Sequence, residues 1–245
     1  MKIIKLDAID STNSFLKDLQ VQTPMDDFTV VVAKHQTKGR GQMNSNWQVE
    51  VGKNLTYSVF CLFSGLKITH HKYLNFCVAL SVFDALNEVN IPDLAIKWPN
   101  DIMSANKKIA GILIENSLKG SNIGSSIIGV GINANQITFS EDLPNASSMK
   151  LILDKHFDLD VLLQSVLLKL QNRVRELNDK KYAALEKAYL NVLYKKNVPT
   201  MFKNSQNILF MGKIIGVSKN GNLLIELADE TIQEFGLKEV SFANL

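Results

Sequence analysis

The sequence is poor in cysteine and proline, two residues that stabilise many small secreted domains. It has only two cysteines and five prolines in 245 residues. Cys61 and Cys77 form no CxxC pair, and each lies in an apolar run, which is typical of small core residues rather than of a disulfide framework or metal motif. We therefore expect a reducing, cytoplasmic location.

Long hydrophobic runs are also missing. No segment approaches the ~20 apolar residues that a membrane helix needs. The apolar start of the chain is interrupted by Asp7 and Asp10 too early for a signal peptide. We expect no membrane partner.

Charge of one sign and clustered metal ligands are equally scarce. The chain has 27 Lys and Arg against 24 Asp and Glu, a net charge of +3, which is too weak to indicate nucleic-acid binding through bulk charge. The four histidines show no metal-ligand spacing, and no Ser/His/Asp or Cys/His arrangement is supported. Any basic site must be local, and no motif predicts a directly bound metal.

The chain does contain the material for one large mixed domain. It is 46% hydrophobic, enough for a sizeable core. Period-two segments alternate with helical ones, which favours a mixed sheet with flanking helices. Expected strands are 2–6, 28–34, 54–63, 94–98, 109–115 and 125–132; expected helices are 11–19, 71–89 and two within 160–194, separated by the polar stretch 178–181.

After Pro199 the pattern changes to short strands with glycine turns. Asn220-Gly221-Asn222 is a strong hairpin signal. We therefore expect a domain at 1–196 followed by a small all-β module at 197–245. The module has four lysines against one aspartate and four glutamates, so nucleic acid is not its obvious partner.

The first segment with chemical character is the loop Gln36-Thr37-Lys38-Gly39-Arg40-Gly41-Gln42. Its glycines let backbone N–H groups turn toward an anion, and Lys38 and Arg40 add positive charge. It lacks the Gly-Lys-Ser/Thr ending of a P-loop and the third glycine of a dinucleotide fingerprint. A phosphate or carboxylate site and a solvated surface loop both remain open, and Trp47 favours the site because an aromatic ring can stack on a purine.

The second segment, Lys97-Trp98-Pro99-Asn100-Asp101, ends an apolar strand. A buried lysine is costly unless an anion or an acid meets it, which makes Lys97 a candidate phosphate contact. Pro99 stops the strand, and Asn100-Asp101 reads as a turn. An ordinary strand exit is the alternative.

Two further segments place small residues inside strands. In Lys108-Ile109-Ala110-Gly111, the glycine permits close approach by a ligand or another backbone. In 128–135 alternate glycines clear one face of a strand, and Asn133 and Asn135 place amides just beyond it, which suits a planar ligand. Glycines that only pack the sheet are the alternative.

Taken in order, these segments resemble the biotin protein ligase family, also called biotin–[acetyl-CoA-carboxylase] ligase. The resemblance covers nearly the whole chain, and five ordered matches are far more specific than one. They are Asp10-Ser11-Thr12-Asn13, the loop at 36–41, Lys97-Trp-Pro-Asn-Asp, Lys108-Ile-Ala-Gly-Ile-Leu-Ile-Glu and Gly129-Val-Gly-Ile-Asn. It implies an α+β fold: a class II synthetase-like domain with a mixed sheet and flanking helices, followed by a small SH3-like β-barrel.

The resemblance implies two reactions. Biotin and ATP, with Mg²⁺ held mainly through the ATP phosphates, form biotinyl-5′-AMP, and a lysine of a biotin carboxyl carrier protein then takes the biotin. Because a carboxylate must approach a polyphosphate, charge neutralisation and alignment supply most of the catalysis. The loop 38–46 is expected to order over the ligand and shield the anhydride from water.

The resemblance also assigns roles by motif position. Lys97 would contact the biotin carboxylate and α-phosphate, Lys108 would add a second charge, and Gly39 and Arg40 would cover the ligand. The ureido ring would be bound by Ser11, Thr12, Asn13 and Gln36; adenine would stack near Trp47, and the nucleotide would be served by Asn133 and Asn135. Gly41, Gln42, Asn100 and Gly111 complete the expected binding set.

Other functions and assemblies stay open at this point. A lipoate or octanoate ligase or transferase has a related fold, a non-catalytic binder of biotin or nucleotide would not need Lys97, and a basic-loop nucleic-acid module is disfavoured by the weak charge. The motifs begin at Asp10, so we expect no helix-turn-helix and no DNA partner. An exposed sheet edge would allow a homodimer or carrier docking by strand addition.

One residue departs from the family pattern and generates a prediction. The family loop usually reads Gly-Arg-Gly-Arg, whereas Gln42 follows Gly41 here. We expect this loss of an arginine to weaken retention of biotinyl-AMP. The dissociation rate of the intermediate should rise in Gln42→Ala and fall in Gln42→Arg; little change in both variants would sink the idea.

Overall fold

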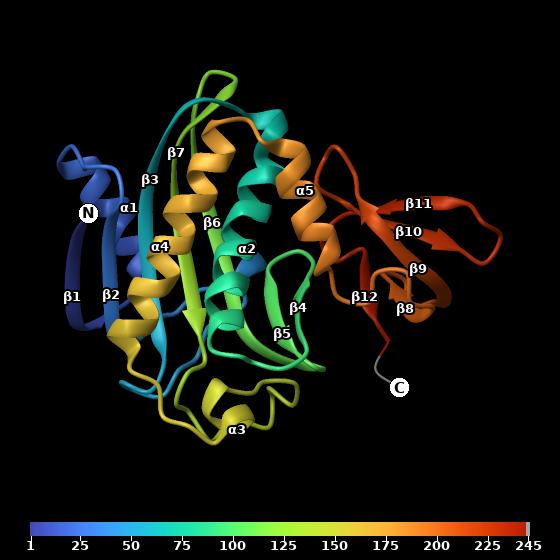
Figure 1. Cartoon of the computed structure of the whole chain (residues 1–245), viewed down its shortest axis with the longest axis horizontal. Coiled ribbons are helices and arrows are strands. Elements are labelled where there is room, and N and C mark those ends of the chain that lie inside the picture. Colours follow the sequence, from blue (N-terminus) through green and yellow to red (C-terminus); the bar gives the residue numbers. More distant parts are fainter. Residues whose placement is uncertain (244–245) are drawn as a thin grey trace.

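A seven-stranded mixed sheet is the centre of the molecule (Figure 1). The computed structural model describes residues 1–243, except the side chain of Asn44. The strand order is β1-β2-β3-β7-β6-β5-β4, with β1 parallel to β2 and every other pair antiparallel. The strands are β1 (Lys2–Ile9), β2 (Thr29–Gln36), β3 (Leu55–Lys67), β4 (Leu94–Lys97), β5 (Asp101–Ser104), β6 (Lys107–Lys119) and β7 (Asn122–Ile132).

Helices cover the two faces of this sheet unequally. One face is packed by α2 (His71–Glu88), α4 (Leu159–Asn178) and α5 (Tyr182–Asn191), which lie in front of the sheet in Figure 1. Among the described helices, α1 (Thr12–Gln22) is the one that packs on the other face. The short helix α3 (Met149–Leu153) and the 3₁₀ turns η1 (Gln42–Asn44) and η2 (Ile68–His70) lie in connections. Because α1 is short, part of its face of the sheet is free to form a site.

Strand β3 shows how side-chain alternation creates this difference. Its odd-numbered residues from Leu55 to Phe63 all lie in the core beneath the three helices. On the opposite face, Phe60 packs with Leu16 of α1. Thr56 and Ser58 share that face with Phe60, so polar groups mark the place where apolar packing by α1 ends.

A second, five-stranded antiparallel sheet follows the helices. Its order is β11-β10-β9-β8-β12, built from β8 (Thr200–Asn204), β9 (Leu209–Val217), β10 (Leu223–Leu227), β11 (Ile232–Phe235) and β12 (Val240–Phe242). It packs beside the β4–β5 hairpin, where Trp98 Nε1 donates to the carbonyl of Gly221 at 2.9 Å and the rings of Tyr194 and Phe242 meet edge to face.

The structure confirms the expected fold class and most elements. The predicted mixed sheet, the two helices separated near 178–181, and the hairpin around Gly221 are all present. The interpretation of Asn100-Asp101 as a simple turn was wrong in part: Asp101 begins β5, which pairs back onto β4 in a hairpin. Among the residues described, no helix has the length and apolar character to cross a membrane.

Helix α1 gives the fold its clearest stability prediction. Leu16 is fully buried between α1 and the sheet, so Leu16→Ala should lower the free energy of unfolding by about 2–5 kcal/mol, measured by urea denaturation. Val21 lies on the same helix and is 86% exposed, so Val21→Ala should change it by less than about 0.5 kcal/mol. Equal effects would contradict the packing described here.

Candidate active site

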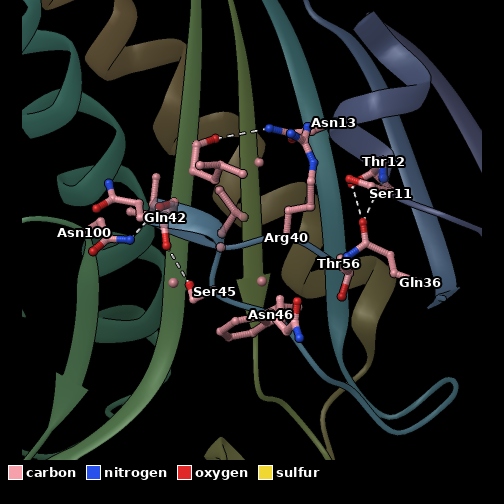
Figure 2. Close-up of a pocket in the computed structure, with 18 of the residues that line it drawn as sticks. Ser11, Thr12, Asn13, Gln36, Arg40, Gln42, Ser45, Asn46, Thr56 and Asn100 are labelled. Atoms are coloured by element: carbon pink, nitrogen blue, oxygen red, sulfur yellow. Dashed lines mark hydrogen bonds between the residues drawn. The ribbon is translucent and has the colours of Figure 1, made fainter. Parts of the chain in front are cut away.

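A pocket of about 240 Å³ lies on the face of the sheet that α1 covers only in part (Figure 2). It is lined by the start of α1, the loop after β2, and neighbouring stretches of β3, β5, β6 and β7. Segments far apart in the sequence therefore contribute side chains to one small volume.

The start of α1 supplies a polar wall. Ser11 is the N-cap of the helix, and its side chain accepts a hydrogen bond from the Ser14 backbone N–H at 3.5 Å, which sets where the helix begins. Gln36, at the end of β2, accepts from the Thr12 backbone N–H at 2.8 Å, and its Oε1 lies 3.0 Å from Thr12 Oγ1. These contacts hold the helix N-terminus against the sheet, as the dashed lines in Figure 2 show.

The wall continues as a chain of side-chain contacts. Ser58 Oγ on β3 lies 2.7 Å from Thr12 Oγ1 and 2.5 Å from Asn13 Oδ1. Asn13 Nδ2 in turn donates to Glu115 Oε2 at 2.8 Å. Ser58 is fully buried and Thr12 and Asn13 nearly so, which means that their polar groups are oriented by one another rather than by solvent.

The glycine loop closes one side of the pocket through an ion pair. Arg40 donates two hydrogen bonds to Glu115, at 2.8 Å and 3.3 Å, in a bidentate arrangement. The loop folds back on itself, with the Gly41 N–H donating to the Ser45 carbonyl and the Trp47 N–H to the Gly39 carbonyl. Glu115 therefore connects the loop with Asn13 of α1.

Glycines on β6 and β7 make room for this arrangement. A Cβ added to Gly129 would lie 2.3 Å from Asn13 Oδ1, and one added to Gly131 would lie 2.2 Å from the Trp47 indole. One added to Gly111 would be 3.1 Å from the same ring. The flat strand surface expected to suit a planar ligand is thus covered by a planar side chain of the protein itself.

Lys108 brings a positive charge into the pocket. Its Nζ lies 2.6 Å from Asp101 Oδ1 on the neighbouring strand β5 and 5.7 Å from the centre of the Trp47 ring. Lys108 thus lies at the same end of the pocket as the two glycines under the indole.

Lys97 occupies a different place. It lines an adjoining cleft of about 450 Å³ between the Lys97–Asp101 turn and the second sheet. Its Nζ lies 5.0 Å from the centre of the Phe242 ring, and burial lowers the pKa of its ammonium, opposed by the nearby Asp101 carboxylate. The pocket and the cleft share Gln42, Asn100 and Asp101, so they are neighbouring compartments.

Eleven of the fifteen predicted site residues line the pocket. They are Ser11, Thr12, Asn13, Gln36, Arg40, Gly41, Gln42, Trp47, Asn100, Lys108 and Gly111. Gly39 lies beside it, its Cα facing the Trp47 carbonyl and the Gln36 amide.

Asn133 and Asn135 lie outside the pocket, where both amides have structural partners. Asn133 Nδ2 donates to the Ser147 carbonyl at 3.0 Å. Asn135 donates to the carbonyl of Phe157 and accepts from its N–H, both at 2.8 Å. Their expected service to a nucleotide stays a prediction, and the observed contacts brace the chain after β7.

Sequence reasoning missed several residues of the site. Thr56, Ser58, Asp101 and Glu115 were not singled out, although the alternation of β3 placed Thr56 and Ser58 together on one face. Within the described part of the chain, no group of three or more His, Cys, Asp and Glu residues is placed to hold a metal.

The glycine under the indole yields a testable consequence. In a Trp98→Phe background, where Trp47 is the remaining tryptophan, Gly131→Ala should displace the indole and shift its fluorescence emission to longer wavelength, because the added methyl group cannot coexist with the ring. Gly216→Ala is the control, since a methyl group there meets no atom within 4 Å. An unchanged spectrum in Gly131→Ala would refute the observed ring position.

Comparison with known proteins agrees with this arrangement. The chain is 28% identical over 247 residues to the bifunctional ligase/repressor BirA of Bacillus subtilis, spanning 99% of this chain and 73% of that protein. It is 33% identical over 126 residues to the biotin–[acetyl-CoA-carboxylase] ligase of Paracoccus denitrificans, about half of each chain.

A solved structure extends the likeness to the whole fold. The biotin protein ligase from Aquifex aeolicus, in complex with biotin and ATP, superposes with a TM-score of 0.80 at 27% identity, covering 100% of this chain and 99% of that one. The sequence model of the biotin/lipoate A/B protein ligase family matches residues 6–133, which hold all the strands and the loop that line the pocket. This chain belongs to the biotin/lipoate A/B protein ligase family.

Proposed function

We propose that the chain is an ATP-dependent biotin protein ligase that forms biotinyl-5′-AMP and transfers biotin to a lysine of a biotin carboxyl carrier protein. The observation that carries the proposal is the polarity of the pocket. A buried hydrogen-bonding wall at Ser11–Asn13 and Gln36 lies at one end, and the charge of Lys108 lies across two cleared strands from it. The Aquifex aeolicus relative binds both biotin and ATP.

The first reaction brings two anions together. A biotin carboxylate oxygen attacks the α-phosphorus of ATP, the new O–P bond forms, and the bond to the β-phosphate oxygen breaks to release pyrophosphate. Lys108, whose Nζ lies 2.6 Å from Asp101 Oδ1, is placed to neutralise the carboxylate and the α-phosphate. Arg40, fixed by Glu115, adds a second cation on the loop side.

Lys97 has a separate part in this proposal. It lies in the adjoining cleft, and its ammonium is desolvated without a salt-bridge partner among the residues described. An anion arriving there would offset that desolvation. The sequence motif predicts that Lys97 contacts the biotin carboxylate and the α-phosphate and that Lys108 adds a second charge. Because Lys97 lines the cleft and Lys108 the pocket, and the two compartments meet at Asn100 and Asp101, we propose instead that Lys97 meets the outgoing phosphates and Lys108 the reacting carboxylate.

The polar wall accounts for selectivity toward biotin. A ureido ring presents two N–H donors and one carbonyl acceptor, which match fixed hydroxyl, amide and backbone groups at Ser11, Thr12, Asn13 and Gln36. Lipoate and octanoate lack these groups, so they would form none of the hydrogen bonds with the wall by which biotin is distinguished.

Adenylation would also need Mg²⁺ and protection of the mixed anhydride from water. Mg²⁺ would be held mainly by the ATP phosphates and would supply charge neutralisation during adenylation. The loop 38–46 and Trp47 would shield the anhydride, with adenine near the indole. The carrier lysine amine then attacks the biotinyl carbonyl, and AMP leaves.

We also propose how the chain is divided into domains and where a carrier protein could dock. Residues 1–196 would form the catalytic domain and 197–245 the SH3-like module, whose sheet flanks the Lys97 cleft. Strand β1 is a sheet edge available for strand addition by a carrier or a second copy. A cytoplasmic setting is supported by two buried free cysteines.

ATP–pyrophosphate exchange with Mg²⁺ tests the proposal. Biotin should stimulate exchange, and lipoate and octanoate should not. Lys108→Met should lower kcat/KM about 10²-fold or more because it removes the charge at the reacting carboxylate. Lys97→Met should raise the KM for ATP more than that for biotin.

Lys119→Met is the matched control, since Lys119 lies on the same strand as Lys108 but is exposed at its far end. Exchange with lipoate or octanoate alone would assign the chain to the other branch of its family. Tight biotin binding without any exchange would instead favour a non-catalytic binder.

A further inference from the structure

Thr56 is a buried hydroxyl group that the protein leaves without a partner. Its side chain lies on β3 and lines the pocket, and only 4% of the residue is exposed. Among the residues that the structure describes, none forms a hydrogen bond with its Oγ1. Buried polar groups nearly always have a partner, so this one calls for an explanation.

The neighbours of Thr56 explain why the protein itself does not satisfy it. Thr56 pairs with Ala33 on β2 and with Gly131 on β7, and neither residue has a polar side chain. Two positions along the same face, Ser58 contacts both Thr12 and Asn13. The network of hydrogen-bonded side chains therefore includes Ser58 but does not reach Thr56, the next residue on the same face of β3.

A second unpartnered group lies beside it. The indole Nε1 of Trp47 is buried without a hydrogen bond to any described residue, and a Cβ on Gly131 would be 2.4 Å from that nitrogen. Gly131 is the direct cross-strand neighbour of Thr56. Two adjacent buried groups that lack partners favour a polar ligand at this point rather than an isolated packing defect.

The strand register sets the direction in which a ligand would lie. Asp101, Gly111, Gly131 and Thr56 form one continuous cross-strand row through β5, β6, β7 and β3. Lys108 lies beside Gly111, at one end of this row of two glycines, where its Nζ would be 3.4 Å from an added Cβ. Thr56 lies at the other end, beside Gly131. Two strand spacings, about 10 Å, separate β6 from β3, which suits a short acid chain that ends in a fused ring.

Stability alone does not account for a threonine at this position. Valine has the same shape and favours strands equally, and it would leave no buried hydroxyl group unpaired. The hydroxyl group becomes useful only when something in the pocket meets it.

We propose that Thr56 is a specificity-determining residue whose Oγ1 hydrogen-bonds the ureido ring of biotin once the Trp47 indole has moved off Gly131. The inference rests on the proposed function and extends it to a residue outside the sequence motifs. A threonine hydroxyl group both donates and accepts, so it serves the ureido carbonyl or an N–H.

The test compares Thr56→Val with Thr56→Ser by isothermal titration calorimetry with biotin, without ATP. Thr56→Val should weaken biotin binding about tenfold, the cost of leaving a buried ligand group unpaired. Its ligand-free Tm should be unchanged or higher by about 2–4 °C, since an unpaired hydroxyl group is lost. Thr56→Ser keeps the hydroxyl group and should bind nearly as wild type. Thr69→Val, at an exposed position, should change neither quantity.

Desthiobiotin, which keeps the ureido group but has no sulfur, identifies the ligand atom. The tenfold loss in Thr56→Val should persist with desthiobiotin. Wild-type affinity of Thr56→Val for biotin, or a loss that disappears with desthiobiotin, would overturn the inference while leaving the proposed function intact. Failure of the wild-type protein to bind biotin would instead refute the proposed function.

Discussion

The pairing of two glycines, Gly111 on β6 and Gly131 on β7, is the constraint on which the pocket depends. Neighbouring strands that both lack a side chain leave a slot across the sheet, and any added Cβ at Gly131 would collide with the Trp47 ring. Gly129 provides the same clearance for Asn13. Only because these three residues have no side chain can the start of α1, the loop and the Trp47 indole approach the sheet so closely.

The pocket and the adjoining cleft each contain one lysine. Lys108 is paired with Asp101 inside the pocket, whereas Lys97 lies against Phe242 in the cleft beside the second sheet. Burial, together with repulsion from Lys108, keeps the pKa of Lys97 below its usual value, against the opposing effect of Asp101. Anionic ligands that span both compartments would relieve this repulsion. Residues of the second sheet line this outer compartment.

Much of this architecture could be predicted from the sequence, because strand alternation and helix periodicity are local signals. The faces of β3, the cap at Ser11 and the helix break near 178–181 follow directly from such patterns. The site was harder. Lys97 ends β4 and Lys108 lies at the start of β6, and only the hairpin of β4 and β5 decides which of them enters the pocket. Asn133 and Asn135 resemble ligand groups in sequence, but their partners Ser147 and Phe157 are distant in the chain. Thr56 belongs to no sequence motif. It stands out only in the structure, where its hydroxyl group is buried without a hydrogen-bond partner among the described residues.

The most direct test of the account is a crystal structure of the protein with biotin bound. We expect biotin to lie across Gly111 and Gly131, with its carboxylate at Lys108 and its ureido ring toward Thr56 and the start of α1, and we expect the Trp47 indole to have left its position over Gly131. Biotin bound elsewhere, or in the pocket with the indole unmoved and the carboxylate away from Lys108, would contradict it.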